Sequence, residues 1–355
     1  MKKSLLALAV LASAAGAAQA ASSVTLYGTV DVGYEKFSNS HQSLSNNDAY
    51  TRDRDMGGNS GFNQTGNDDS NFGIKGEEDL GNGLSAIFKL ESRLNADTGT
   101  QARSRFFERE SWVGLKGSFG TVRFGRSNGA MERALGDYNP GNRVATIWDN
   151  YNSDFGLRGN TSTRVDNSAF YDYDNGGFNI GANVTTKGGA REVEDGYEGL
   201  KGRKMGYGVH ASYAGNISTN VGYSVAAAYQ KNGSRGFDVN GKGREWGAAA
   251  EVSFKPVAVG GSYADFKNSD FNLKQRTWGA YITADLTAND SLYVKYLSKR
   301  AKVAGSQISK DDMFALGVSH SLSKRTSVYA DVAHYRNRLD GTKTTGFDIA
   351  MRHKF

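Results

Sequence analysis

The chain has 355 residues with no cysteine, and its formal net charge is +6. The absence of cysteine excludes a disulfide scaffold, thiolate catalysis and a zinc–thiolate site. The small positive charge is interspersed along the chain and forms no basic block, so it does not support nucleic-acid binding. The 45 glycines, 36 Tyr and Phe residues (18 of each) and only two prolines favour a chain made mostly of β-strands.

The N-terminus predicts a cleaved secretory signal peptide. Two lysines precede the apolar stretch 5–12, and the Ala-Gln-Ala sequence at 18–20 has the pattern of a cleavage site. A retained membrane anchor is the alternative, but the apolar run fades into Ala, Ser and Gly and is short for a membrane helix. We therefore assign residues 1–20 to the signal peptide and residues 21–355 to one mature domain that leaves the cytoplasm.

The mature chain alternates apolar and polar residues in sixteen segments. In a strand, successive side chains point to opposite faces, so each segment has one apolar and one polar face. No other apolar run reaches the ~20 residues that a membrane helix needs. The alternating positions lie at 24–34, 72–74, 84–90, 113–115, 122–124, 165–171, 178–184, 207–213, 221–229, 246–254, 257–263, 278–286, 292–296, 314–318, 328–332 and 347–355.

Short and long connections alternate between these segments, which predicts how the strands are arranged. A membrane-spanning up-and-down barrel has short periplasmic turns and longer external loops, whereas a sandwich has no reason for this pattern. We therefore expect an all-β fold, a transmembrane antiparallel 16-stranded up-and-down β-barrel whose apolar face meets lipid and whose polar face lines a water-filled lumen. The expected long connections are 37–69, 96–105, 127–163, 187–204, 232–243, 268–275, 301–311 and 337–343.

The third long connection, 127–163, is far longer than an ordinary hairpin loop. It is either a solvated external loop or a loop folded into the lumen that narrows the channel. Its residues Trp148, Tyr151 and Phe155 would serve as apolar anchors, which a merely solvated loop would lack. The sequence therefore favours an inward-folded third loop.

Three segments and the terminal residue together resemble the general porins of β-proteobacterial outer membranes, of the neisserial, Burkholderia and Delftia type. These are "SSVTLYGTVDVGY" at the mature N-terminus, "NFGIKGEEDLGNGLSAIFKLES" at 71–92, "SWVGLKGSFGTVRFGR" at 111–126 and the terminal Phe355. The resemblance implies an outer-membrane homotrimer through which ions and small hydrophilic solutes diffuse passively. It also implies that Phe355 is a signal for the outer-membrane assembly machinery, and the location adds lipid and lipopolysaccharide as partners.

The resemblance and strand parity together indicate where the pore residues lie. Several members of the family are anion-selective because arginines on the wall face the third loop. The candidate basic wall residues here are Lys75, Lys89, Arg93 and Arg123. The candidate acidic residues on the loop opposite are Glu132, Asp137 and Asp149. Many relatives carry an arginine where this chain has Asn71, so we expect only a weak anion preference.

The sequence holds no pattern typical of an enzyme or a cofactor site. The five histidines are scattered, and no P-loop or dinucleotide fingerprint is present. The segment 172–177, "DYDNGG", lacks the glutamate that closes a calcium loop and is expected to be a hairpin turn. We therefore expect no cofactor, metal or catalytic residue. A barrel enzyme with a rim catalytic set and a substrate-specific channel remain as alternatives to a general porin.

The last ten residues, "GFDIAMRHKF", predict the strand that closes the barrel. Phe347, Ile349 and Met351 form a lipid face that ends in Phe355. We expect this strand to pair with the first one, because pairing removes both free edges. His353 falls on the lipid face, where a charged or polar side chain has no evident partner in the sequence.

Overall fold

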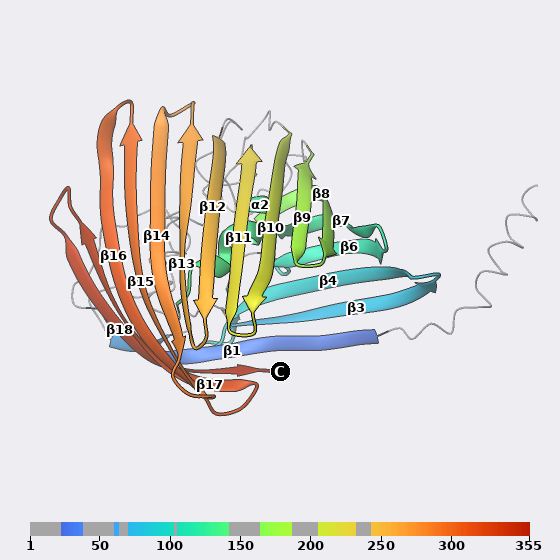
Figure 1. The fold of residues 1–355 in the computed structure, drawn as a ribbon, viewed down its shortest axis with the longest axis horizontal. Coiled ribbons are helices and arrows are strands. Elements are labelled where there is room, and N and C mark those ends of the chain that lie inside the picture. Colours follow the sequence, from blue (N-terminus) through green and yellow to red (C-terminus); the bar gives the residue numbers. More distant parts are fainter. Residues whose placement is uncertain are drawn as a thin grey trace, which may run out of the picture.

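The structure is a computed structural model that describes residues 23–37, 60–63, 70–102, 105–141, 164–186, 205–231 and 243–355. Sixteen long strands form one antiparallel sheet that closes into a barrel, as predicted (Figure 1). Among the described residues, no helix is both long enough and apolar enough to cross a membrane. The long strands are β1 (Ser23–Phe37), β3 (Asn71–Gly81), β4 (Leu84–Asn95), β6 (Glu110–Gly117), β7 (Gly120–Asn128), β8 (Arg164–Asn175), β9 (Phe178–Thr185), β10 (Gly206–Ser218), β11 (Val221–Lys231), β12 (Gly243–Phe254), β13 (Val257–Asn268), β14 (Leu273–Asp285), β15 (Asp290–Val303), β16 (Ser306–Ser321), β17 (Thr326–Asn337) and β18 (Lys343–Lys354).

The barrel closes between its first and last strands, as the alternation of the C-terminal residues predicts. β1 pairs with β18 from Thr29 opposite Lys354 onward. The backbone of Phe355 continues this pairing, because it exchanges hydrogen bonds of 3.0 and 3.1 Å with Gly28. Figure 1 shows the C-terminus lying beside β1. His353 also has a partner, since its Nδ1 lies 2.9 Å from the Thr326 hydroxyl on β17.

The two faces of the sheet reverse the polarity of a soluble protein. Large apolar side chains are exposed on the outer face; Val259, Ile282 and Ile349 are 51, 49 and 62 % exposed. Polar and charged side chains such as Glu245 and Asp348 are buried on the inner face. This distribution suits a barrel with hydrocarbon outside and water inside, because lipid-facing side chains then meet an apolar solvent.

The connections agree with the predicted alternation at one end and differ from it at the other. Each even-numbered connection is a tight turn of two to four residues. Two connections predicted to be long are short, because β13 and β14 are joined by 269–272, and β15 and β16 by 304–305. Phe266, Leu273 and Ala301 form a buried apolar cluster on the inner face at this end. The cluster stabilises β13 to β15 past the points where the sequence predicts these strands to end or begin.

Two short strands lie inside connections that the sequence predicts to be loops. β2 (Ser60–Asn63) pairs with β1, and β5 (Thr100–Gln101) pairs with the end of β4. With four and two residues they are too short to show a period of two. Neither spans the barrel, so the count of sixteen spanning strands is unaffected.

The described part of the third long connection folds against the inner face of the wall. It forms α2 (Ala130–Leu135) and the 3-10 turn η1 (Gly136–Tyr138), and α2 contacts β9 to β12 (Figure 1). Met131 and Leu135 are fully buried there. They pack on a platform of small inner-face residues: Ala226, Ala228, Ala249 and Ala264.

Glycine residues on the wall also make room for α2. A Cβ atom added at Gly208 would lie 2.8 Å from the Cβ of Ala130, and one added at Gly247 would collide with Leu135. The predicted anchors Trp148, Tyr151 and Phe155 lie outside the described residues. The path of the complete loop therefore stays a prediction.

Candidate functional site

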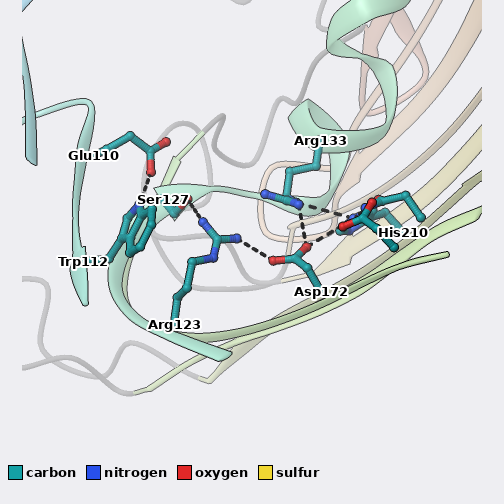
Figure 2. Close-up of polar contacts among 9 residues, drawn as sticks. Glu110, Trp112, Arg123, Ser127, Arg133, Asp172 and His210 are labelled. Carbon is teal, nitrogen blue, oxygen red and sulfur yellow. Dashed lines mark hydrogen bonds and ion pairs between the residues drawn. The ribbon is translucent and has the colours of Figure 1, made fainter. Parts of the chain in front are cut away.

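A carboxylate on β8 joins the barrel wall to the third long connection. Asp172 Oδ2 lies 2.6 Å from Nη2 of Arg123 on β7, and its Oδ1 lies 2.6 Å from Nη2 of Arg133 on α2 (Figure 2). Arg123 and Asp172 are both almost completely buried. Asp172 therefore holds one arginine of the wall and one arginine of the loop segment at the same point of the inner face.

Aromatic rings fix the orientation of Arg123. Its guanidinium carbon lies 5.1 Å from the Trp112 ring centroid and 5.2 Å from that of Phe170. Nη1 also donates a hydrogen bond of 3.0 Å to the Ser127 hydroxyl. The Trp112 indole is itself held by a hydrogen bond of 2.7 Å to Glu110 (Figure 2). A planar guanidinium between two rings and a carboxylate has little freedom to move.

The Arg133 side chain is partly buried among other polar groups. Its Nε lies 3.4 Å from Nε2 of His210 on β10, and that nitrogen lies 3.0 Å from the Asn179 side-chain oxygen. Burial lowers the pKa of Arg133, Asp172 opposes this shift, and the neighbouring Arg123 adds to it. Two guanidinium groups thus share the Asp172 carboxylate, and the charges of Glu110 and Asp174 also favour the protonated form of Arg133.

Two further carboxylates on the same side of the barrel also hold two basic groups each. Glu91 on β4 lies 3.0 Å from Lys89 Nζ and also pairs with Arg109. Asp166 on β8 lies 2.9 Å from Arg105 and also pairs with Arg126. The inner wall of β4 to β8 therefore repeats one arrangement, an acidic group shared by two basic groups.

The four predicted wall residues lie on the inner face of β3, β4 and β7. Lys75 and Lys89 are direct cross-strand partners, and both ammonium groups lie over the Tyr27 ring, at 5.3 and 5.6 Å. Arg93 pairs with Glu108 at 3.5 Å. Arg123 is the member that reaches the loop segment, through Asp172. Asn71, which stands where relatives have an arginine, is buried opposite Arg93.

The predicted acidic loop residues are less closely related to this cluster. Glu132 is half-buried on α2, and its charge acts on Arg164 at the start of β8. Asp137 is exposed on η1, which lies on the side of β12 and β13. Asp149 lies outside the described residues. The loop residue that meets the wall at Asp172 is basic, Arg133, and not one of the three predicted acids.

Sequence reasoning missed Asp172, Arg133 and Trp112. Asp172 was read only as part of a turn sequence, although the parity of β8 puts it on the polar face. Arg133 lies in the third long connection, whose register against the wall cannot be read from the sequence. In the described part of the chain, no three His, Asp or Glu side chains are grouped so that they could hold a metal ion.

A closed barrel with an apolar outer face and a charged inner face is the architecture of an outer-membrane channel. The family model described as Gram-negative porin matches residues 7–340. The chain belongs to the Gram-negative porin family.

Relatives and solved structures agree with this assignment. An outer membrane porin protein of Bordetella pertussis is 28% identical over 396 residues, and outer membrane porin protein 32 of Delftia acidovorans is 30% identical over 384 residues; each alignment covers 100% of both chains. The structure of the anion-selective porin from Comamonas acidovorans superposes with a TM-score of 0.68 and 25% identity, covering 94% of this chain and 100% of that one. The protein is therefore a general diffusion porin of the outer membrane, and family and fold indicate a channel rather than an enzyme.

Proposed function

We propose that this porin is weakly anion-selective and that residues 130–141 narrow its pore. The observation that carries the selectivity is the repeated sharing of one carboxylate by two basic groups on the wall of β4 to β8. Six basic groups pair with three carboxylates, Glu91, Asp166 and Asp172. With Arg93, Glu108 and Glu110 of the same wall included, seven basic groups face five carboxylates, which leaves a small positive excess. A pore lined by an excess of one sign attracts ions of the opposite sign.

In this proposal, Lys75, Lys89, Arg93 and Arg123 form the basic wall of the constriction, and Arg133 adds to it from the loop. Glu132, Asp137 and Asp149 would moderate the preference from the loop side. The relative from Comamonas, which is described as anion-selective, supports the same sign. Reversal potentials of the purified protein in a planar bilayer with a KCl gradient test the proposal. We expect chloride to permeate better than potassium, and a clear cation preference would contradict it.

The cysteine-free chain allows a direct test of the inward-folded loop. A Cβ atom added at Gly208 would lie 2.8 Å from the Cβ of Ala130. This separation is within about 1 Å of the usual Cβ–Cβ distance in a disulfide, so cysteines at the two positions could be joined after a small shift. We expect this pair to cross-link on oxidation in the native membrane. The matched control pairs A130C with V209C, whose side chain faces lipid, and should not cross-link. Equal cross-linking of both pairs would mean that α2 does not rest on the inner face.

The assembly and processing of the chain complete the proposal. We infer a homotrimer in contact with outer-membrane lipid and lipopolysaccharide, delivered by the assembly machinery that reads Phe355. Conductance steps in multiples of three and a cross-linked trimer are the expected observations. N-terminal sequencing of the mature protein should begin at Ala21.

The pore has neither enzymatic activity nor a dedicated substrate in this proposal. Hydrolysis assays on phospholipid and peptide substrates should give no turnover. Sugars or phosphate, added up to high concentration, should not block the single-channel current in a saturable way. Saturable block by one solute would favour the alternative of a substrate-specific channel.

A further inference from the structure

The outer face of the barrel carries a row of five basic residues in direct cross-strand register. Lys231 on β11 pairs with Arg244 on β12, Arg244 with Lys267 on β13, Lys267 with Lys274 on β14, and Lys274 with Lys302 on β15. We call these five residues the basic ladder. Each member is exposed or half-exposed.

The ladder has few acidic neighbours to balance it. In the next row toward the middle of the barrel, Asp265 lies 3.5 Å from Lys267 and 3.1 Å from Arg276. That row continues with Arg276 opposite Arg300, and Arg300 opposite Lys310. Arg300 is paired with Asp312 at 3.1 Å, so the two rows together hold more basic than acidic groups. Like charges directly opposite each other destabilise a sheet. A bound anion would remove this repulsion.

The position of the ladder relative to the membrane indicates where such an anion lies. Ten residues of β12 separate Arg244 from Phe254 at the short-turn end. At about 3.4 Å per residue and a tilt of about 40°, they span roughly 25 Å, which is the height of the apolar band of a membrane barrel. The ladder lies at the end of the long connections, and therefore at the headgroup level of the outer leaflet.

Aromatic residues mark the upper border of the apolar band just below the ladder. Each of the five strands carries one on the outer face, within two to six residues of its ladder residue. Trp246 and Tyr263 have ring centroids 5.3 Å apart, as have Trp278 and Tyr296. Such rings sit at the interface between hydrocarbon and headgroups. The five aromatic residues are Tyr229, Trp246, Tyr263, Trp278 and Tyr296.

A half-open hollow of about 190 Å³ lies where the ladder meets this aromatic border. Tyr229, Arg244, Trp246 and Lys267 contribute to its lining, together with Asp265 and Glu245. The volume is well above the roughly 10–15 Å³ that one water molecule needs. It therefore has room for a phosphate group beside the two cationic side chains.

We propose that the basic ladder binds the phosphate groups of an anionic glycolipid headgroup in the outer leaflet. The inference rests on the outer-membrane location and deepens the lipid contact of the proposed function by naming its residues. Lysine and arginine donate charge-assisted hydrogen bonds to phosphate oxygens, and the aromatic side chains below them contact the lipid's apolar part. Clusters of basic residues at the membrane surface recognise lipid phosphates in this way.

The test compares lipid binding by two variants with the same loss of charge. The ladder variant is R244Q/K267Q/K274Q. The control variant is K255Q/K324Q/R325Q, whose residues are exposed in turns at the opposite end of the barrel. Purified proteins in detergent are titrated with bisphosphorylated lipid A and with dephosphorylated lipid A, and bound lipid is counted by native mass spectrometry.

We expect the wild type and the control variant to bind the bisphosphorylated lipid at least tenfold more tightly than the ladder variant does. Binding should persist in EDTA, because the side chains contact phosphate without a bridging cation. Three results would overturn the proposal: an equal loss of lipid binding in the ladder and control variants, equal affinity of the wild type for the bisphosphorylated and the dephosphorylated lipid, or complete loss of binding in EDTA. Conductance and ion preference should be unchanged in the ladder variant, so this test and the test of the pore can fail separately.

Discussion

At the scale of single residues, the charge balance of the pore depends on Asp172. This carboxylate neutralises part of the charge of Arg123 and Arg133, and all three side chains are partly or largely buried. Asp172→Asn removes one negative charge and leaves both guanidinium groups facing the lumen. We expect a stronger anion preference, seen as a larger reversal potential of the same sign in a KCl gradient.

The matched control for Asp172→Asn is Glu78→Gln, an exposed position near the β3–β4 turn. It has the same change of charge but lies away from the cluster, so its reversal potential should be that of the wild type. A shift of the Asp172→Asn channel toward cations would show that the cluster does not set the ion preference.

Phe355 is the second residue on which a prediction depends. Its backbone closes the β1–β18 pairing at Gly28, and its ring fills the space above that glycine, where an added Cβ would lie 2.5 Å from the ring. Deleting Phe355 removes both the last cross-strand hydrogen bonds and an interfacial aromatic ring. We expect a several-fold lower yield of assembled barrel, measured by the mobility shift of unheated samples in electrophoresis. Phe355→Tyr should assemble normally, and normal assembly of the deletion would refute an assembly role.

At the scale of elements, α2 is held on the wall mainly by Met131 and Leu135. Both side chains are fully buried on the alanine platform of β11 to β13. Truncating a buried Met or Leu to Ala costs about 2–5 kcal/mol. A six-residue helix has little stability of its own. We therefore expect α2 of the M131A/L135A variant to leave the wall.

The measurement for M131A/L135A is single-channel conductance in a planar bilayer. We expect a larger and noisier conductance than in the wild type, because the segment that we propose narrows the pore becomes mobile. Leu316→Ala on the outer face of β16 is the control, since it makes a similar truncation away from α2. An unchanged conductance of the double variant would show that α2 does not limit the current.

The sequence predicts the spanning strands well, because a period of two is a local property that requires no knowledge of the partner strand. It fails at the upper ends of β13 to β16 for a physical reason. There the polarity of the two faces is exchanged, with Phe266 and Leu273 inside and Lys267 and Lys274 outside. The apolar positions of the lipid face therefore end before the strands do, and the sequence pattern predicts a loop there.

The candidate site shows a second limit of sequence reasoning. The parity of β7 correctly put Arg123 on the inner face. Its meeting with Arg133 depends on how a connection of more than thirty residues folds back, and no local pattern encodes that register. At this point the loop residue that pairs with Asp172 beside Arg123 is the basic Arg133, and the acidic side of the constriction stays a prediction.

At the scale of the whole molecule, the distribution of charged residues differs between the inner and outer faces of the barrel and along the height of its wall. The inner wall of β4 to β8 holds carboxylates shared by two basic groups, and α2 covers an apolar platform on the facing strands. Outside, an apolar band is bordered above by aromatic rings and the basic ladder. A substitution should therefore change stability according to the side of the sheet it faces, even between adjacent residues.

Ile282 and Thr283 on β14 provide that comparison. Ile282 is 49% exposed on the outer face, four residues from both Trp278 and Leu286, and so near the middle of the apolar band. Thr283 faces the lumen. Arginine in the middle of the lipid face costs about 2–4 kcal/mol, because its charge loses hydration in hydrocarbon. Ile282→Arg should therefore lower the free energy of unfolding in urea by about this amount in lipid vesicles, whereas Thr283→Arg, whose charge stays in water, should change it little and instead strengthen the anion preference. Equal destabilisation by both variants would mean that the two faces of β14 do not meet different solvents, against the arrangement of the entire barrel.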